Sequence, residues 1–244
     1  MLLQAFRRRA KGKSEAEKPF WISYADLMTA MMVLCLVTMA VTILVTQKAK
    51  NEASAEAKER AEAIGSICDS LEEKLATLGE SGISIDDCDS DRNRIDFGER
   101  GRFALASDRL PDGAAPAIAA FLPQVLSVAK SDEGIRWMRR VVVEGYTDTK
   151  GGYLYNLNLS LRRSERVMCL LMDQRANPAL TLSNTEIAEV QQLFVAGGVS
   201  FADQMETAEE SRRVEMRLEF YPPGDRDPIT TRAQFSAAPD RCRI

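Results

Sequence analysis

The sequence predicts an α+β protein with one N-terminal transmembrane helix, a helical linker and one extracytoplasmic domain. Three features predict this class: a 27-residue apolar run from Phe20 to Thr46, a following segment rich in Ala, Glu, Lys and Arg, and an alternation of strand-like and helix-like stretches from Arg94 onward. We therefore expect a basic cytoplasmic tail at 1–19, a transmembrane helix at 20–46, a helical linker at 47–92, a mixed sheet-and-helix domain at 93–221 and a tail at 222–244.

The apolar run is long enough to cross a bilayer. At about 1.5 Å per helical residue it spans about 40 Å. A signal peptide is the alternative, but its apolar core is usually 7–15 residues long and ends at a small-residue cleavage site. Basic flanks stay in the cytoplasm, so the N-terminus should lie inside and the bulk of the chain outside. The basic residues before the run are Arg7, Arg8, Arg9, Lys11, Lys13 and Lys18.

Asp26 is the only charged side chain in this run. A carboxylate in hydrocarbon costs several kcal/mol unless it is protonated or faces a partner or water. Asp26, Ala30, Val33 and Val37 share one helical face by their spacing of three and four. One helix cannot enclose a pore, so partner helices are required. We interpret Asp26 as an ion carrier; a passive anchor whose Asp26 reaches to the interface is the alternative.

The composition argues against several other functions. The net charge is −4 and histidine is absent, which disfavours direct nucleic-acid binding, His-based triads and most zinc sites. No C-x-x-C pair and no nucleophile with an evident base occur, so we expect no metal, no cofactor and no enzymatic activity. The carried ion should be H⁺ rather than Na⁺, because a lone carboxylate offers few oxygen ligands.

Four of the five cysteines follow the apolar run. Cys35 lies within it, whereas Cys68, Cys88, Cys169 and Cys242 would lie outside. Disulfides among these four are expected if the compartment is oxidising. Their connectivity cannot be read from the sequence.

The linker carries a heptad-like seam that allows two interpretations. Its small and apolar residues alternate at spacings of four and three: Ala57, Ala61, Ile64, Cys68, Leu71, Leu75 and Leu78. This pattern fits a short coiled coil, in which Cys68 could meet Cys68 of a second copy. It fits equally well an amphipathic helix that lies on its own domain.

The outer domain begins with short strands and a helix. Apolar residues alternate around two glycines and predict strands or a hairpin: Ile95, Phe97, Phe103 and Leu105. Residues 114–129 read as a helix, and Val141 to Tyr146 as a strong strand.

The rest of the domain continues this alternation. Helices are expected at 157–173, ended by Asn177-Pro178, and at 185–192. Residues 213–221 alternate as a strand with one buried face. The predicted order is β-α-β-α-(α/β)-β, which packs one sheet against its helices. The tail from Pro222 should be irregular.

A motif within this domain is more specific. Its parts are Thr147, Asp148 and Gly151; then Asn156, Leu159, Ser160 and Arg163; then Arg213, Val214 and Glu215. This resembles the T-D-x-x-G, N-x-x-L-S-x-x-R and R-V-E pattern of OmpA-like peptidoglycan-binding domains. The resemblance implies that Asp148 binds the ammonium and Arg163 the carboxylate of diaminopimelate, with Asn156, Leu159, Ser160 and Arg213 completing the peptidoglycan site. Ser164 and Ser211 depart from the usual Ala and Asn.

The two halves together resemble a known architecture. The stretch FWISYADLMTAMM is similar to the transmembrane segment of MotB-like stator subunits, in which Asp26 matches the proton-accepting aspartate. The resemblance implies an inner-membrane homodimer inside a pentamer of a MotA-like (ZorA-like) subunit, with the outer domain on periplasmic peptidoglycan. The sequence of this stretch and the short tails resemble the ZorB family of Zorya anti-phage systems more than other members. A flagellar or gliding stator, or a passive peptidoglycan tether, is the alternative.

Overall fold

The computed structural model describes residues 18–77, 82–86, 88, 93–224 and 242. The chain divides into two compact units, residues 1–55 and 56–244. The predicted basic tail therefore lies outside the described residues except for 18 and 19, and the predicted C-terminal tail is described only at 222–224 and 242.

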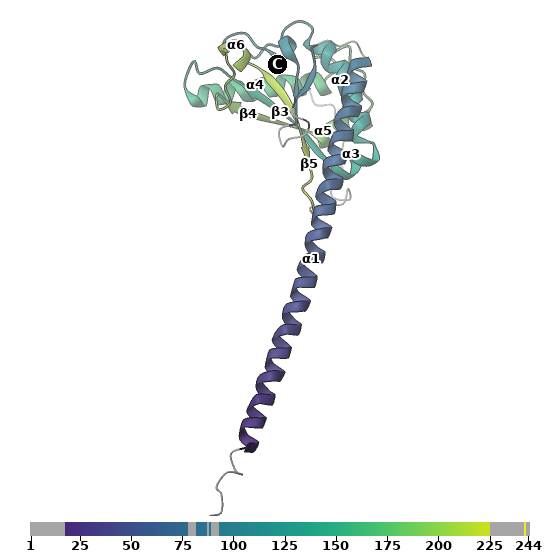
Figure 1. Ribbon diagram of the computed structural model, residues 1–244. Coiled ribbons are helices and arrows are strands. Elements are labelled where there is room, and N and C mark those ends of the chain that lie inside the picture. The colour runs from purple at the N-terminus through teal and green to yellow at the C-terminus, as the bar shows by residue number, and fades with distance from the viewer. Residues whose placement is uncertain (1–17, 78–81, 87, 89–92, 225–241, 243–244) are drawn as a thin grey trace, which may run out of the picture. The chain divides into compact units, whose positions relative to one another are not determined.

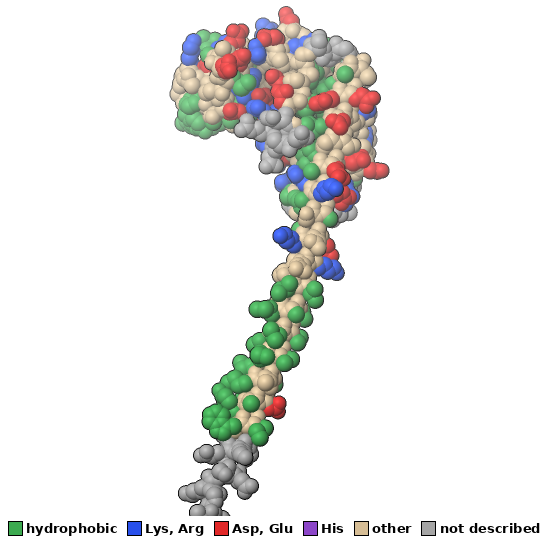
Figure 2. Space-filling model, in the orientation of Figure 1, with side chains coloured by type: hydrophobic (Ala, Val, Ile, Leu, Met, Phe, Trp, Pro, Cys, Tyr) green, Lys and Arg blue, Asp and Glu red, His purple; other side chains and the backbone are tan. Residues whose placement is uncertain are grey.

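The first unit is the N-terminal part of helix α1, which spans Lys18–Thr77. Among the described residues α1 is the one helix long and apolar enough to cross a membrane, with a mean hydropathy of 2.5 over its most apolar window. Figure 2 shows apolar side chains along this stretch. The hydroxyls of Thr38 and Thr42 donate to backbone carbonyls three or four residues earlier, so these polar groups are satisfied without water.

The second unit is built on a five-stranded sheet with the order β1-β2-β5-β3-β4. The strands are β1 Ser84–Asp86, β2 Arg94–Asp96, β3 Met138–Tyr146, β4 Phe194–Ser200 and β5 Val214–Phe220. Neighbours pair antiparallel except β3 and β4, which are parallel. Val143 opposes Met216 across β3 and β5, and both are fully buried, so one face of the sheet forms the core.

Helices complete the second unit (Figure 1). They are η1 Gly98–Gly101, α2 Ala114–Ala129, α3 Asp132–Trp137, α4 Tyr153–Met172, α5 Asn184–Leu193 and α6 Ala208–Ser211. Helices α2 and α4 carry buried apolar faces, with Phe121 and Leu171 completely enclosed. Helix α5 begins at a capping box formed by Ser183 and Glu186, which satisfies exposed backbone donors at its first turn.

Two glycines set how closely α4 lies on the sheet. A Cβ atom at Gly145 would be 2.0 Å from the carbonyl oxygen of Ser160, and one at Gly198 would be 2.6 Å from the Ser160 hydroxyl. Only residues without a Cβ allow this approach. The small residues therefore fix α4 on β3 and β4, and with it the loop that joins β3 to α4.

The second part of α1 packs on its own domain. Ile64, Ile67, Cys68 and Leu71 are each at most 7% exposed and belong to the core of the second unit. Four seam residues, Ile64, Cys68, Leu71 and Leu75, are thus buried as the amphipathic-helix interpretation expects, and the coiled-coil interpretation is wrong for them. The seam positions Ala57 and Ala61 are exposed, and Leu78 lies outside the described residues. The boundary expected at 92/93 also differs, because residues 56–77 belong to the globular unit.

The predicted α+β class is confirmed, and the differences are local. Helix 114–129 has the predicted bounds. The expected strand at Phe103 and Leu105 is wrong, because the chain forms η1 and then makes only an isolated bridge between Arg102 and Arg213, the residue before β5. Strand β4 was not predicted as such, since its FVAGGVS sequence contains two glycines that weaken the alternation.

Candidate functional site

Asp26 lies on an exposed face of α1. Together with Thr29, Ala30, Val33 and Val37 it lines a shallow groove of about 580 Å³, and Thr29 donates to the Asp26 carbonyl at 2.9 Å. The small Ala30 one turn along leaves room beside the carboxylate. The face therefore combines one ionisable group with apolar neighbours.

Asp148 is placed by the end of β3 and is 4% exposed. Its Oδ1 accepts from the backbone N–H of Lys150 at 3.1 Å, and its Oδ2 accepts from Arg212 Nη1 at 3.0 Å. The Asn156 amide donates to the Lys150 carbonyl at 3.0 Å. Asn156 thus ties the first turns of α4 to the loop that presents Asp148.

Arg163 projects from α4 and is completely buried. Its Nε donates to the Ser107 carbonyl at 2.9 Å, its Nη2 to the Ala104 carbonyl at 3.3 Å, and its Nη1 to the Tyr146 carbonyl. The guanidinium lies 4.6 Å from the centre of the Phe103 ring. Burial lowers the pKa of Arg163 to about 10, while the nearby carboxylate of Asp148 acts in the opposite direction. The side chain remains charged at neutral pH.

Leu159 and Ser160 lie beneath this region as packing residues. Leu159 is 3% exposed and Ser160 is fully buried. The Ser160 hydroxyl accepts from the Ser200 backbone N–H at 3.1 Å and donates to the Leu157 carbonyl at 2.8 Å. Ser160 therefore joins α4 to the end of β4 rather than facing outward.

Arg213 lies apart from Asp148 in a second buried charge cluster. It donates to Glu215 at 2.6 Å, and its guanidinium lies 4.1 Å from the centre of the Tyr146 ring. Burial and the neighbouring carboxylate of Glu144 raise the pKa of Tyr146 above its usual value. Within the described part of the chain Arg213 makes no hydrogen bond to Asp148, and its support of the peptidoglycan site stays a prediction.

Arg212 is the residue that the sequence analysis missed. Besides its contact with Asp148, it donates through Nε to the Phe103 carbonyl at 3.1 Å and through Nη1 to the Ala208 carbonyl at 3.0 Å. Neighbouring residues at the start of a strand point to opposite faces, so only one member of the Arg212-Arg213 pair can reach Asp148. The signal in the sequence was the adjacent Arg212-Arg213 pair. The alternation of side chains along a strand could have identified Arg212 as the alternative to Arg213.

The four cysteines that follow the apolar run form two disulfides, Cys68–Cys88 and Cys169–Cys242. The first joins the packed part of α1 to the segment after β1. The second joins α4 to the C-terminal segment. Cys68 is thus bonded within its own chain, which removes the expected contact with Cys68 of a second copy.

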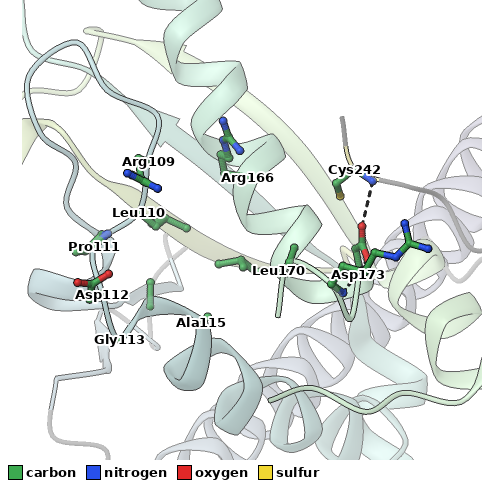
Figure 3. Close-up of a pocket in the computed structure, with 13 residues that line it drawn as sticks. Arg109, Leu110, Pro111, Asp112, Gly113, Ala115, Arg166, Leu170, Asp173 and Cys242 are labelled. Atoms are coloured by element: carbon green, nitrogen blue, oxygen red, sulfur yellow. Dashed lines mark hydrogen bonds between the residues drawn. The ribbon is translucent and has the colours of Figure 1, made fainter. Parts of the chain in front are cut away.

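A basic cavity of about 770 Å³ lies between the segment before α2 and the C-terminal half of α4 (Figure 3). Arg109 and Arg166 line it, together with Arg175 and Asp173. Arg166 is paired with Asp108 at 3.5 Å, and Asp173 accepts from the Cys242 backbone N–H at 3.2 Å. Within the described part of the chain, no group of three or more His, Cys, Asp or Glu residues could hold a metal ion.

Comparison with known proteins gives one strong relative. The chain is 44% identical over 221 residues to the Zorya protein ZorB of Escherichia coli O139:H28, which covers 91% of this chain and 88% of that protein. No protein-family model matches.

Solved structures resemble the chain more weakly. The periplasmic domain of Helicobacter pylori MotB is 16% identical over 59% of this chain and 82% of that one, with a TM-score of 0.38. A MotB-like protein from Desulfovibrio vulgaris is 18% identical over 69% of this chain and 98% of that one, with a TM-score of 0.44. Both TM-scores are below 0.5, and no assignment rests on them.

Proposed function

The chain belongs to the ZorB family of Zorya proteins, and on this premise we propose that it is the peptidoglycan-anchored membrane subunit of a proton-driven motor in anti-phage defence. The observation that carries the proposal is Asp26, the single charged residue of the apolar run. An ionised acid in the membrane is costly unless a partner or water faces it, so an intramembrane carboxyl group favours a functional role such as ion transport. A passive tether would be served better by leucine at this position.

The carboxyl group is suited to load and release one proton at a time. In general, desolvation favours the neutral form of a carboxyl group, whereas water or a positive dipole favours the ionised form. The energy available is about 2.3 kcal/mol per charge for each 100 mV of membrane potential. Alternation between the two forms can therefore be coupled to movement of a surrounding subunit. The proposed partner is a MotA-like pentamer around two copies of this chain, and the proposed ion is H⁺ rather than Na⁺.

Replacement of Asp26 by Asn tests the motor. The amide is similar in size but cannot carry a proton, so defence against phage should be lost, as measured by the efficiency of plaque formation. The amount of protein in the membrane fraction should stay at the parental level. Full defence by Asp26→Asn would exclude proton passage through this residue and would favour a passive tether.

Anchoring to peptidoglycan is a separable part of the proposal. It places the N-terminus in the cytoplasm and the second unit in the periplasm, where Asp148 is buried among polar partners at the end of β3. The carboxylate would receive the ammonium of the cell-wall peptide. Asp148→Asn should reduce co-sedimentation of the protein with purified sacculi at least tenfold. Equal retention of Asp148→Asn and the parent would exclude this site.

A further inference from the structure

We propose that the basic cavity of Figure 3 is a second ligand site, which binds a phosphomonoester group carried by a small organic molecule or a lipid head group. The cavity is separate from the proposed anchoring site, because neither Asp148 nor Arg163 lines it. The inference also does not depend on proton transport. Its basis is the arrangement of three arginines and one helix N-terminus around a space of about 770 Å³.

Two of the arginines have guanidinium groups without an acceptor among the described residues. The hydrogen bonds that Arg109 and Arg175 make there come from their backbone N–H groups, which donate to Ser107 and Asp173. Both arginines are exposed. Arg109 lies in the segment before α2 and Arg175 in the turn after α4, so the two side chains line the cavity from different chain segments.

The third arginine is held in place by one edge of its guanidinium group. Arg166 projects from α4, and its Nε and Nη2 each lie 3.5 Å from Oδ2 of Asp108. Among the described residues this contact leaves Nη1 without an acceptor. Its side chain is 31% exposed, so the group is partly fixed and still accessible. A guanidinium oriented in this way favours an oxyanion that accepts two parallel N–H bonds.

The start of helix α2 adds a backbone donor to the same cavity. Its N-cap is Gly113, which has no side chain to satisfy the first turn. The backbone N–H of Ala115 makes no hydrogen bond to another described residue, and the following Pro116 has no N–H. Gly113 and Ala115 both line the cavity. Free N–H groups at the N-terminus of a 16-residue helix favour a bound anion.

The charges and size of the cavity select the class of ligand. Three arginines and two aspartates, Asp112 and Asp173, line it, so the lining has one excess positive charge. Asp173 is engaged by the backbone N–H groups of Arg175 and Cys242. A phosphomonoester has three acceptor oxygens and a charge of about −1.5 to −2, which suits several guanidinium groups better than one carboxylate does. The volume is that of a site for a small organic molecule, and apolar side chains complete the lining: Leu110, Pro111 and Leu170.

Calorimetric titration of the full-length protein in detergent and phosphate-free buffer tests the site. The probe is glycerol 3-phosphate, which should bind the parent saturably, whereas glycerol should not bind. Arg109→Gln and Arg166→Gln should each weaken binding at least fivefold. The matched control is Arg162→Gln, since Arg162 also lies on α4 and approaches Asp108 at 4.0 Å but does not line the cavity. This control should bind within twofold of the parent.

Arg109→Gln separates binding from folding, because its guanidinium group has no acceptor among the described residues and its loss should leave Tm unchanged. The site is excluded if glycerol 3-phosphate does not bind the parent, or if Arg109→Gln binds as tightly as Arg162→Gln. Equal weakening by all three variants would also refute it, since binding would then follow the overall charge.

A lipid probe distinguishes the two sources of the phosphomonoester. Dihexanoylphosphatidate carries the same group on a lipid. Binding tighter than that of glycerol 3-phosphate would support the site and assign it to a lipid head group. Equal or weaker binding would support a soluble phosphomonoester.

Discussion

Replacing Leu71 with alanine should destabilise the second unit and leave its association state unchanged. Leu71 is 1% exposed and belongs to the single core of that unit. The substitution removes three buried carbons, about 2.4 kcal/mol at about 0.8 kcal/mol per methylene, and the cavity left behind raises the loss to about 3–4 kcal/mol. For a unit of this size about 1 kcal/mol lowers Tm by roughly 2–4 °C, so we expect a decrease of about 10 °C.

The assay is thermal unfolding of the segment Glu56–Ile244 expressed alone. Circular dichroism monitors the unfolding at several protein concentrations. The control is Glu73→Ala, an exposed position on the same helical stretch, which should change Tm by at most about 2 °C. A Leu71→Ala protein as stable as this control would refute packing of α1 on the domain. So would a Tm that rises with protein concentration, because that dependence is expected of an intermolecular coiled coil.

Two further predictions concern Tyr146 and the disulfides. Because the pKa of Tyr146 is raised in the folded state, its contribution to stability should be intact below about pH 10, the unfolded value, and should decrease by about 1.4 kcal/mol per pH unit above it. Urea unfolding of the parent and of Tyr146→Phe between pH 9 and 11 should show this slope in their difference, and parallel curves would contradict it. Because Cys68 is bonded to Cys88, denatured protein on a non-reducing gel should migrate as a monomer; a dimer that disappears in Cys68→Ser would contradict the pairing.

The sequence was sufficient to predict an element of secondary structure where its local pattern agrees with the packing in the folded protein. The helix at 114–129 and the strand at 141–146 carry strong periodicity, and both occur in the structure. The segment around Phe103 was wrongly predicted as a strand. Phe103 is buried in a loop, where it packs against the Arg163 guanidinium, and burial alone does not distinguish a loop residue from a strand residue. The carbonyls of this segment are needed by the Arg163 guanidinium, and such a long-range requirement leaves no local periodicity.

The candidate site was only partly visible for the same reason. Asp148 was identified through its motif, and its place at the end of β3 follows from the strand before it. Arg212 comes from 64 residues further along the chain, and the choice between it and Arg213 depends on the register of β5. Likewise, the heptad spacing of Ile64 and Leu71 fits a second helix or the protein's own core, and only the tertiary packing decides between them.

Proton flux through the assembled complex tests the central claim most directly. The protein and the proposed MotA-like subunit would be placed in vesicles that contain a pH-sensitive dye, and a potassium gradient with valinomycin would set the membrane potential. We predict acidification with the parental chain and none above the empty-vesicle rate with Asp26→Asn. Equal acidification by the parent and Asp26→Asn would contradict the account.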